Sequence, residues 1–466
     1  MAGLAEMRAL FARHGQEHIF GHWRTLSEKE REELLNDCQE IDFSWLTARQ
    51  AQIMSSPRRA QNLLIEPPPV LRLPQSPCEK AAAKRARAVG EKVLRAGRVA
   101  AFVVAGGQGT RLGCECPKGC YPLGPVSGKT LFQWHAEQIR ARSQRYGVKI
   151  PWYIMTSRDN DAAIRSYFAA NDYLGFSPND IMFLTQRMVP TLTPEGRLML
   201  ANKCHIAMSP DGHGGALYAL ASSGALADMK RRGIEVISYF QVDNPLVNIC
   251  DPVFLGYHML AKAEMSLKIV EKRSPDEKVG HACLQNGKLA VVEYSEMPRA
   301  LMEARAADGR LRFWAGSIAI HFFQVSFLER LAAETNLPWH KARKKIPVWK
   351  PGEVRQPEMV DGIKFETFIF DALPFAQKTM AMEVAREDEF APLKNATGED
   401  SVDSCRQLIS ERFAKWLAAS GIRLPRTKEG RLTAMIEISP LYALDAAELV
   451  KKIRGKIKVE RLVALG

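Results

Sequence analysis

The sequence lacks the features of membrane proteins and of small disulfide-bonded domains. Its 466 residues contain no apolar run near the roughly 18 residues that a membrane-spanning helix needs. Glu6, Arg8 and Arg13 interrupt the stretch where a signal peptide would be apolar. Nine cysteines are few for this length, and an odd number leaves one unpaired in any disulfide scheme. We therefore expect a soluble cytoplasmic protein with reduced thiols and no membrane partner.

Internal repeats and low-complexity tracts are also absent, and the composition excludes wholesale disorder. Hydrophobic residues make up 46% of the chain and charged residues 25%, which is typical of a globular protein of two or three domains. Lys and Arg number 65 against 52 Asp and Glu, a formal net charge of +13. This excess favours a polyanionic partner such as nucleic acid, an acidic membrane surface or a phosphorylated small molecule, without choosing among them.

The N-terminal part of the chain is predicted to be helical and then extended. Ser27 and Glu30 have the spacing of a capping box. Six prolines between residues 57 and 77 remove backbone donors and predict an extended connector, and a basic helix should follow from Glu79 to Arg95. We place the domains at 1–95 (helical segment with the connector), 96–385 (catalytic domain) and 386–466 (small mixed lobe).

The middle of the chain alternates short apolar runs with helical stretches. The first run, Val99 to Val104, has the length and composition of a buried strand. Similar runs lie at 152–155, 181–184, 236–242 and 267–270, and helices are expected at 133–146 and 216–232. This alternation predicts an α/β fold with a mostly parallel, Rossmann-like sheet that helices cover on both faces.

A glycine-rich loop follows the first strand, and glycines let backbone N–H groups approach a phosphate. The dinucleotide fingerprint does not fit, because Leu112 stands where its third glycine belongs. Three residues instead of four separate Gly124 from Gly128, Lys129 and Thr130, so this P-loop-like stretch is predicted to be a turn and a helix start. Arg111 and Lys118 could instead place two permanent cations around a triphosphate.

Residues 106–113 (GGQGTRLG), followed by Pro117-Lys118-Gly119, resemble the signature of the UDP-sugar pyrophosphorylases, most closely the UDP-N-acetylhexosamine (UDP-N-acetylglucosamine) pyrophosphorylases. Further stretches agree in the same order at 152–157, 208–215, 242–244, 292–295 and 386–395, so the resemblance covers roughly residues 95 to 400. It implies a GT-A-like nucleotidyltransferase that joins UTP and a sugar 1-phosphate and releases pyrophosphate. The partners would be these two small molecules and no nucleic acid.

The resemblance also implies roles for individual residues. Arg111, Lys118 and Lys394 would hold the triphosphate and the transferred phosphoryl group as catalytic residues. Asp243, at the end of an apolar strand, suits a Mg²⁺ ion that bridges phosphate oxygens, although by itself it could cap the following turn. The nucleotide would contact Gly106, Gly107, Gln186 and Gly212. The sugar would contact His213, Gly280, Glu293, Tyr294, Ser295, Ser317, Phe368 and Phe370.

Two of these sugar-side positions depart from the N-acetylhexosamine pattern. His213 and Ser317 each stand where that branch usually has asparagine, and histidine in this glycine loop is a feature of the UDP-glucose and broad-range branches. Asparagine offers a donor and an acceptor to an acetamide, whereas neutral histidine offers one of each in another geometry and serine is shorter. The surrounding stretches predict N-acetylglucosamine 1-phosphate as the substrate, with glucose 1-phosphate or a broad sugar range as the alternative.

Three further patterns have plainer interpretations. Cys114, Cys116 and Cys120 could suggest zinc, but no fourth ligand has suitable spacing. Phe368 and Phe370 alternate as core-facing strand residues do. The basic run 341–345 (Lys341, Arg343, Lys344, Lys345) is predicted to be a solvated face, since no aromatic interleaving accompanies it. An inactive RNA-binding protein is the alternative from another class, and the sequence leaves the oligomeric state open.

Overall fold

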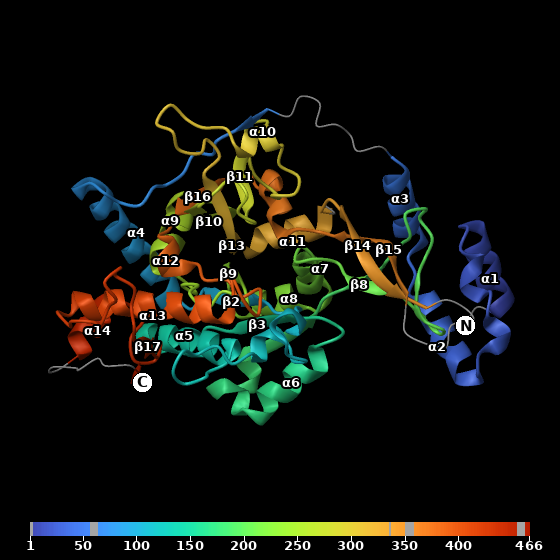
Figure 1. Ribbon diagram of the computed structural model, residues 1–466, viewed down its shortest axis with the longest axis horizontal. Coiled ribbons are helices and arrows are strands. Elements are labelled where there is room, and N and C mark those ends of the chain that lie inside the picture. Colours follow the sequence, from blue (N-terminus) through green and yellow to red (C-terminus); the bar gives the residue numbers. More distant parts are fainter. Residues whose placement is uncertain (1–2, 56–63, 335–336, 350–357, 454–461) are drawn as a thin grey trace. The chain divides into compact units, whose positions relative to one another are not determined.

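The computed structural model describes residues 3–55, 64–334, 337–349, 358–453 and 462–466, and the chain divides into two compact units (Figure 1). Unit 1 comprises residues 1–63, 187–215 and 337–369. Unit 2 comprises residues 64–186, 216–336 and 370–466. The domain boundaries expected at residues 95 and 385 stay a prediction.

Unit 2 is built on a large sheet, to which ten strands contribute among the residues that the structure describes. Its main path runs β1-β11-β13-β9-β2-β3-β4; β10 pairs with β13 and β16, and β12 pairs with β11. Their bounds are β1 Ile65–Glu66, β2 Val99–Val104, β3 Trp152–Thr156, β4 Ile181–Thr185, β9 Val236–Gln241, β10 Met265–Glu271, β11 Gly280–Gln285, β12 Lys288–Val292, β13 Ala315–Gln324 and β16 Thr379–Glu383. Strands β9, β2, β3 and β4 are mutually parallel, whereas β13 is antiparallel to β9 and β10. The predicted α/β fold is confirmed.

Helices cover both faces of this sheet, as side chains on β3 illustrate. Neighbouring residues of a strand point to opposite faces. Trp152 packs edge-on against Phe132 of α5 (Leu131–Tyr146), while the hydroxyl of Tyr153 donates to Asp228 of α8 (Ala225–Arg231) at 2.6 Å. Every residue of β3 is therefore buried, which explains why the sequence shows a continuous apolar run there instead of alternation.

The helices of unit 2 largely match the sequence-based expectations. The expected helices at 79–95 and 133–146 are α4 and α5, and Thr130 caps α5 with a capping box to Gln133, which confirms the predicted turn and helix start. The expected helix over 216–232 is interrupted, because Gly224 has φ +79° and separates α7 from α8. Their bounds are α4 Pro77–Arg95, α5 Leu131–Tyr146, α6 Asp161–Ala170, α7 Gly215–Ser222, α8 Ala225–Arg231, α9 Pro252–Leu260, α10 Arg299–Met302, α11 Val325–Glu334 and α12 Arg386–Glu389.

Two helices and a two-stranded sheet form the described C-terminal part of unit 2. Helix α13 (Val402–Ala419) packs against β17 (Met435–Ile438), which pairs in parallel with β18 (Leu462–Leu465), and α14 (Ala446–Lys452) lies between the two strands in sequence. Ile409, Phe413 and Leu417 of α13 belong to the same buried core as the strands β2 and β3. This segment therefore packs onto the main sheet of the unit through apolar side chains.

Unit 1 combines three N-terminal helices with strands from two later parts of the chain. Its core contains Phe11 and Leu34 from the helices and Phe20 from a 3-10 turn, together with Leu198, which precedes a strand, and Phe365 within a strand. Gln16 fixes this arrangement, since its side chain donates to Gly196 O at 3.2 Å and accepts from Leu198 N at 2.7 Å. The elements are α1 Leu4–Arg13, α2 Glu28–Gln39, α3 Phe43–Met54, β5 Met188–Pro190, β6 Leu200–Asn202, β7 His205–Ile206, β8 Met208–Pro210, β14 His340–Val348 and β15 Glu358–Glu366.

Two expectations from the sequence concern membrane-spanning helices and the state of the thiols. None of the described helices combines the length and the apolar character required to cross a membrane. Cys114 and Cys116 form a disulfide, contrary to the expectation of reduced thiols throughout. The short loop that carries both residues brings them within bonding distance, so the bridge and a zinc site at the same thiols exclude each other.

Candidate active site

The predicted nucleotide residues of unit 2 lie at one edge of its sheet. Strands β9, β2, β3 and β4 are parallel, so their carboxyl ends meet at the same edge. Asp243 follows β9, the glycine loop follows β2, and Gln186 follows β4. Open α/β sheets bind their ligands at this edge, because successive loops there diverge and leave a crevice.

The glycine loop folds back on itself and so aligns its first half, residues 106–109, with its second half, residues 114–119. Gly109 N donates to Cys116 O at 2.9 Å, and Lys118 N donates to Gly107 O at 3.1 Å. Gln108 and Pro117 form an isolated β-bridge between the halves. The result places Lys118 beside Gly107, where a Cβ would lie 4.0 Å from the lysine Cε. Arg111 lies in the 3-10 turn over 110–112 between the halves and is exposed.

Lys118 and Asp243 form an ion pair at this edge. The lysine Nζ lies 3.2 Å from Asp243 Oδ2, and the side chains are 18% and 15% exposed, so the pair is reachable but largely shielded from water. Opposite charges in this environment attract more strongly than on an open surface. The structure thus brings together the predicted phosphate-binding lysine and the predicted metal-binding carboxylate.

Lys394 is attached to the same place through the backbone. Leu393 N donates to Asp243 O at 2.8 Å, and Asn244 bridges the two segments by donating to Glu389 O at 2.8 Å and accepting from Ala391 N at 3.1 Å. The Lys394 side chain pairs with Asp400 at 3.4 Å. Lys394 is therefore a second cation near Asp243, because its neighbour Leu393 is hydrogen-bonded to the Asp243 backbone.

Gln186 and Gly106 lie in contact, as expected for two residues on one nucleotide. Gln186 is 6% exposed, and its backbone N–H donates to Thr156 O at 2.9 Å. A Cβ on Gly106 would lie only 2.8 Å from Gln186 Oε1. The absence of a side chain at Gly106 thus allows the glutamine amide to occupy this position.

Three predicted sugar residues of unit 2 also come together, on β11, directly after β12 and on β13. Gly280 is the register partner of Ser317, and a Cβ on Gly280 would lie 3.7 Å from Glu293 Oε1. The Ser317 hydroxyl is buried and has no hydrogen-bond partner in the part of the chain that the structure describes. Tyr294 and Ser295 follow β12 and are exposed. Phe370 is 5% exposed and belongs to a 3-10 segment over Ile369–Phe375, not to a strand.

The other predicted residues belong to unit 1, where they pack on one another. Gly212 has φ +81°, and a Cβ there would lie 2.4 Å from Thr367 O. The His213 ring stacks on Phe368 with centroids 5.3 Å apart. The expected strand through Phe368 is wrong, because β15 ends at Glu366 and Thr367 turns to bond Asp211 and Gly214 through its backbone.

His213 is neutral near pH 7. Burial, and then the charge of His340, lowers the pKa of His213 to about 4. Its Nδ1 lies 3.3 Å from Ile369 N, which donates to it, so the neutral ring carries its proton on Nε2. His213 therefore presents a hydrogen-bond donor at the position where the resemblance expects an asparagine.

Two supporting groups were not anticipated from the sequence. Asn160 is buried and donates to Ala105 O at 3.0 Å, which fixes the start of the glycine loop. Lys268 is fully buried, with its Nζ 2.7 Å from Asp251 Oδ2 and 2.6 Å from Glu389 Oε2. The only sequence signal for Lys268 is a lysine inside the apolar strand β10, where an unpaired charge would be costly.

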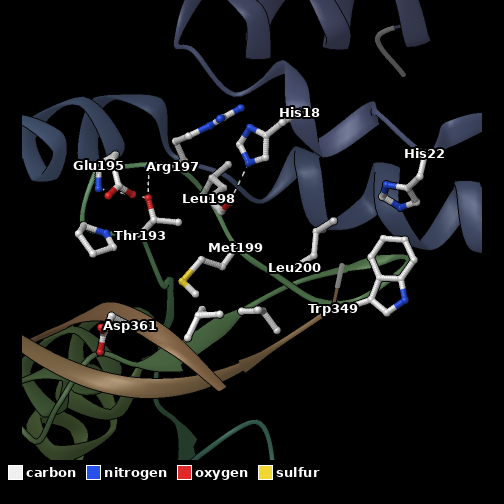
Figure 2. Close-up of a pocket in the computed structure, with 13 residues that line it drawn as sticks. His18, His22, Thr193, Glu195, Arg197, Leu198, Met199, Leu200, Trp349 and Asp361 are labelled. Carbon is white, nitrogen blue, oxygen red and sulfur yellow. Dashed lines mark hydrogen bonds between the residues drawn. The ribbon is translucent and has the colours of Figure 1, made fainter. Parts of the chain in front are cut away.

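A cavity and the basic run 341–345 both lie in unit 1, and neither contains a predicted site residue. The cavity of about 460 Å³ in Figure 2 has Glu195 and Arg197 at one end and His22 and Trp349 at the other. The lysines and arginine of the run 341–345 on β14 are exposed, which agrees with a solvated face. Neither feature contains a glycine loop of the kind found in unit 2.

The sequence is similar to those of known proteins over nearly its whole length. The model of the UTP–glucose-1-phosphate uridylyltransferase (UDPGP) family matches residues 73–466. The chain belongs to this family. It is 36% identical to the human UDP-N-acetylhexosamine pyrophosphorylase-like protein 1, over 98% of this chain and 96% of that one. It is 34% identical to the UDP-N-acetylglucosamine pyrophosphorylase of Saccharomyces cerevisiae, over 97% and 98% of the two chains.

A solved structure of this uridylyltransferase family agrees with the fold over the whole length. The uridine diphosphate N-acetylglucosamine pyrophosphorylase from Trypanosoma brucei, crystallised with an inhibitor, superposes with a TM-score of 0.81 at 28% identity. The similarity covers 100% of this chain and 99% of that one. The resemblance inferred from the sequence motifs is confirmed, and the chain is a nucleotidyltransferase.

Proposed function

We propose that this uridylyltransferase forms UDP-N-acetylglucosamine and pyrophosphate from UTP and N-acetylglucosamine 1-phosphate. The observation that carries the proposal is the similarity to the yeast UDP-N-acetylglucosamine pyrophosphorylase over nearly the whole of both chains. A phosphate oxygen of the sugar phosphate attacks the α-phosphorus of UTP, and the bond from that phosphorus to the bridging oxygen of pyrophosphate breaks. The reaction needs mainly alignment of two anions and neutralisation of the leaving group.

The cations of unit 2 provide this neutralisation in the proposal. Lys118 leaves its ion pair with Asp243 to bind phosphate oxygens of UTP, and Arg111 binds them from the exposed turn of the same loop. Lys394 holds the sugar phosphate or the phosphoryl group in transfer. Gln186, next to Gly106, would pair with the uracil edge through its amide. These roles stay predictions about individual side chains.

Magnesium fits the Asp243 position. The ion prefers oxygen ligands and commonly binds through one or two carboxylates together with substrate phosphates. Asp243 is partly exposed at the sheet edge and offers such a carboxylate. It would hold the ion, which would bring positive charge to the phosphate oxygens.

Removal of divalent metal is expected to lower kcat by at least about 10²-fold. Without the ion, less positive charge would compensate the negative charges of the two phosphate groups. EDTA-treated enzyme and Mg²⁺ add-back, followed by pyrophosphate release, measure this. Asp243→Asn should raise the Mg²⁺ concentration needed for half-maximal rate. The exposed Asp308→Asn is the control and should leave it unchanged. Full activity in EDTA would contradict the metal role.

A specific observation favours glucose 1-phosphate as the second candidate substrate. Ser317 of unit 2 presents a short buried hydroxyl, which has no hydrogen-bond partner among the described residues. It can bond a sugar hydroxyl, whereas it does not offer the paired donor and acceptor of an asparagine to an acetamide. The family description itself names glucose 1-phosphate.

Pyrophosphate release from UTP, with N-acetylglucosamine 1-phosphate and glucose 1-phosphate in parallel, decides between the two. We expect kcat/KM to be at least about tenfold higher for the acetylated sugar, a difference of about 1.4 kcal/mol in transition-state binding. Ser317→Asn should widen this ratio, and Ser317→Ala is its control. No release with N-acetylglucosamine 1-phosphate would overturn the proposal. Tight, salt-sensitive RNA binding without turnover of any sugar phosphate would favour the RNA-binding alternative.

A further inference from the structure

Unit 1 contains a compact group of potential metal ligands that belongs to none of the motifs discussed above. Glu33 lies on α2, Cys204 directly precedes β7, and His205 is the first residue of β7. One ligand atom of each residue lies within 4.8 Å of the others, and this is the only such group found among the residues with described positions. Cys204 is 7% exposed, while His205 and Glu33 are partly exposed, so one side of the group faces solvent.

Two of the distances between these atoms are close to those of ligands around one zinc ion. Cys204 Sγ lies 3.3 Å from Glu33 Oε2, and His205 Nε2 lies 3.8 Å from the same oxygen. Zinc bonds of about 2.1 Å to oxygen and nitrogen and about 2.3 Å to sulfur place neighbouring tetrahedral ligands roughly 3.4–3.6 Å apart. A single small ion can therefore bind at Glu33 Oε2, and the side chains that hold it would close from separations within 4.8 Å.

Asp37 orients His205 in the way that supporting carboxylates orient metal-binding histidines. Its Oδ2 lies 3.2 Å from His205 Nδ1 and also accepts from Ile206 N at 2.9 Å. A ring that donates Nδ1–H to Asp37 carries its lone pair on Nε2, which faces Glu33. Histidines that bind metals usually donate their other N–H to a carboxylate in this manner. This arrangement is independent of the spacing of the three ligands.

Glu33 directs one of its carboxylate oxygens at the other two ligands. Its Oε1 pairs with the exposed Lys29 at 3.8 Å, while its Oε2 faces Cys204 and His205. The lone pair of His205 Nε2 and this carboxylate oxygen are both acceptors and face each other. A divalent cation would bind all three groups at once.

We propose that Glu33, Cys204 and His205 bind a divalent ion of the zinc class, with Asp37 as the group that orients the histidine. Thiolate, imidazole and carboxylate together favour Zn²⁺ or Co²⁺ over Mg²⁺, which prefers oxygen ligands alone. Three protein ligands leave the fourth position to water on the exposed side. The ion would join α2 to the β6-β7 hairpin, two elements separated by more than 150 residues of sequence.

Titration of the tag-free, full-length protein with Co²⁺ tests the proposal. Cobalt bound by a thiolate gives a sulfur-to-metal charge-transfer band, and we expect this band to saturate at one equivalent. Cys204→Ser should remove the band. Cys78→Ser, which changes an exposed free cysteine in unit 2, is the matched control and should retain it. Asp37→Asn should keep the band but weaken binding by about 10- to 100-fold.

A second measurement guards against variants that fail to fold. Zn²⁺ at about 100 times Kd should raise the thermal midpoint of the wild type, since an ion that binds only the folded state stabilises it. Glu33→Gln and His205→Gln, which keep the size of the side chains, should fold and lose this shift. Absence of stoichiometric Co²⁺ binding, or a band that persists in Cys204→Ser, would leave the group as a plain hydrogen-bond network and overturn the proposal.

Discussion

Lys118→Ala is expected to lower kcat by about 10²- to 10³-fold while the protein stays folded. The lysine side chain provides one of the charges that compensate the leaving pyrophosphate, and loss of one such group commonly costs this much. Its partner Asp243 remains partly exposed and can be hydrated, so the fold should tolerate the change. Single-turnover measurements of pyrophosphate release, with circular dichroism as the check on folding, test this.

The control for Lys118 is Lys149→Ala. Lys149 also pairs with an aspartate, Asp180, but its side chain is 79% exposed. Exposed pairs contribute little, so kcat should remain at the wild-type value. A Lys118→Ala enzyme with an unchanged kcat and only a raised KM for UTP would remove Lys118 from the chemical step and leave it as a substrate-binding residue.

Lys268→Met is expected to destabilise the protein by about 3–5 kcal/mol. The substitution leaves Asp251 and Glu389 buried without their cation, and a broken buried ion pair typically costs this much. Urea unfolding monitored by tryptophan fluorescence measures the loss. The matched control is Lys415→Met, because Lys415 also pairs with two carboxylates, Glu387 and Asp388, but is 48% exposed. It should cost no more than about 1 kcal/mol.

The pH dependence of this loss has a definite sign. Burial raises the pKa of Glu389, and removal of Lys268 takes away the charge that opposes this effect. A carboxyl group with a raised folded-state pKa binds its proton more tightly when folded, so the variant should lose stability as the pH rises. The difference from the wild type should therefore be smaller near pH 5 than near pH 8. An equal loss for Lys268→Met and Lys415→Met would contradict the role of burial.

The parts of the fold that depend on local sequence were predictable. The strand Trp152–Thr156 is buried throughout and apolar from Trp152 to Met155 because helices cover both of its faces, and Thr130 with Gln133 marks a helix start by direct side-chain bonding. Such signals require only neighbours along the chain. The resemblance likewise located Lys118 and Asp243, which the structure brings within 3.2 Å of each other.

Features that depend on distant partners were not predictable. Lys268 meets Glu389 across 121 positions of sequence, and nothing beside either residue indicates the other. The strand expected through Phe368 ends early because Thr367 bonds Asp211, 156 positions away. Glu33 likewise meets Cys204 and His205 only in the folded chain, so local sequence does not predict this group. In each case tertiary contact, not local propensity, determines the outcome.

The order of the segments in unit 1 has a consequence during synthesis. Helices α1 to α3 leave the ribosome with Phe11 and Phe20 exposed, because their apolar partners Leu198 and Phe365 come much later in the chain. The last stretch of the unit follows the first by about 300 residues, a delay of roughly 15–60 s at ordinary translation rates. Until then the nascent N-terminus presents a surface that chaperones bind, so shortened chains that end before residue 337 should aggregate.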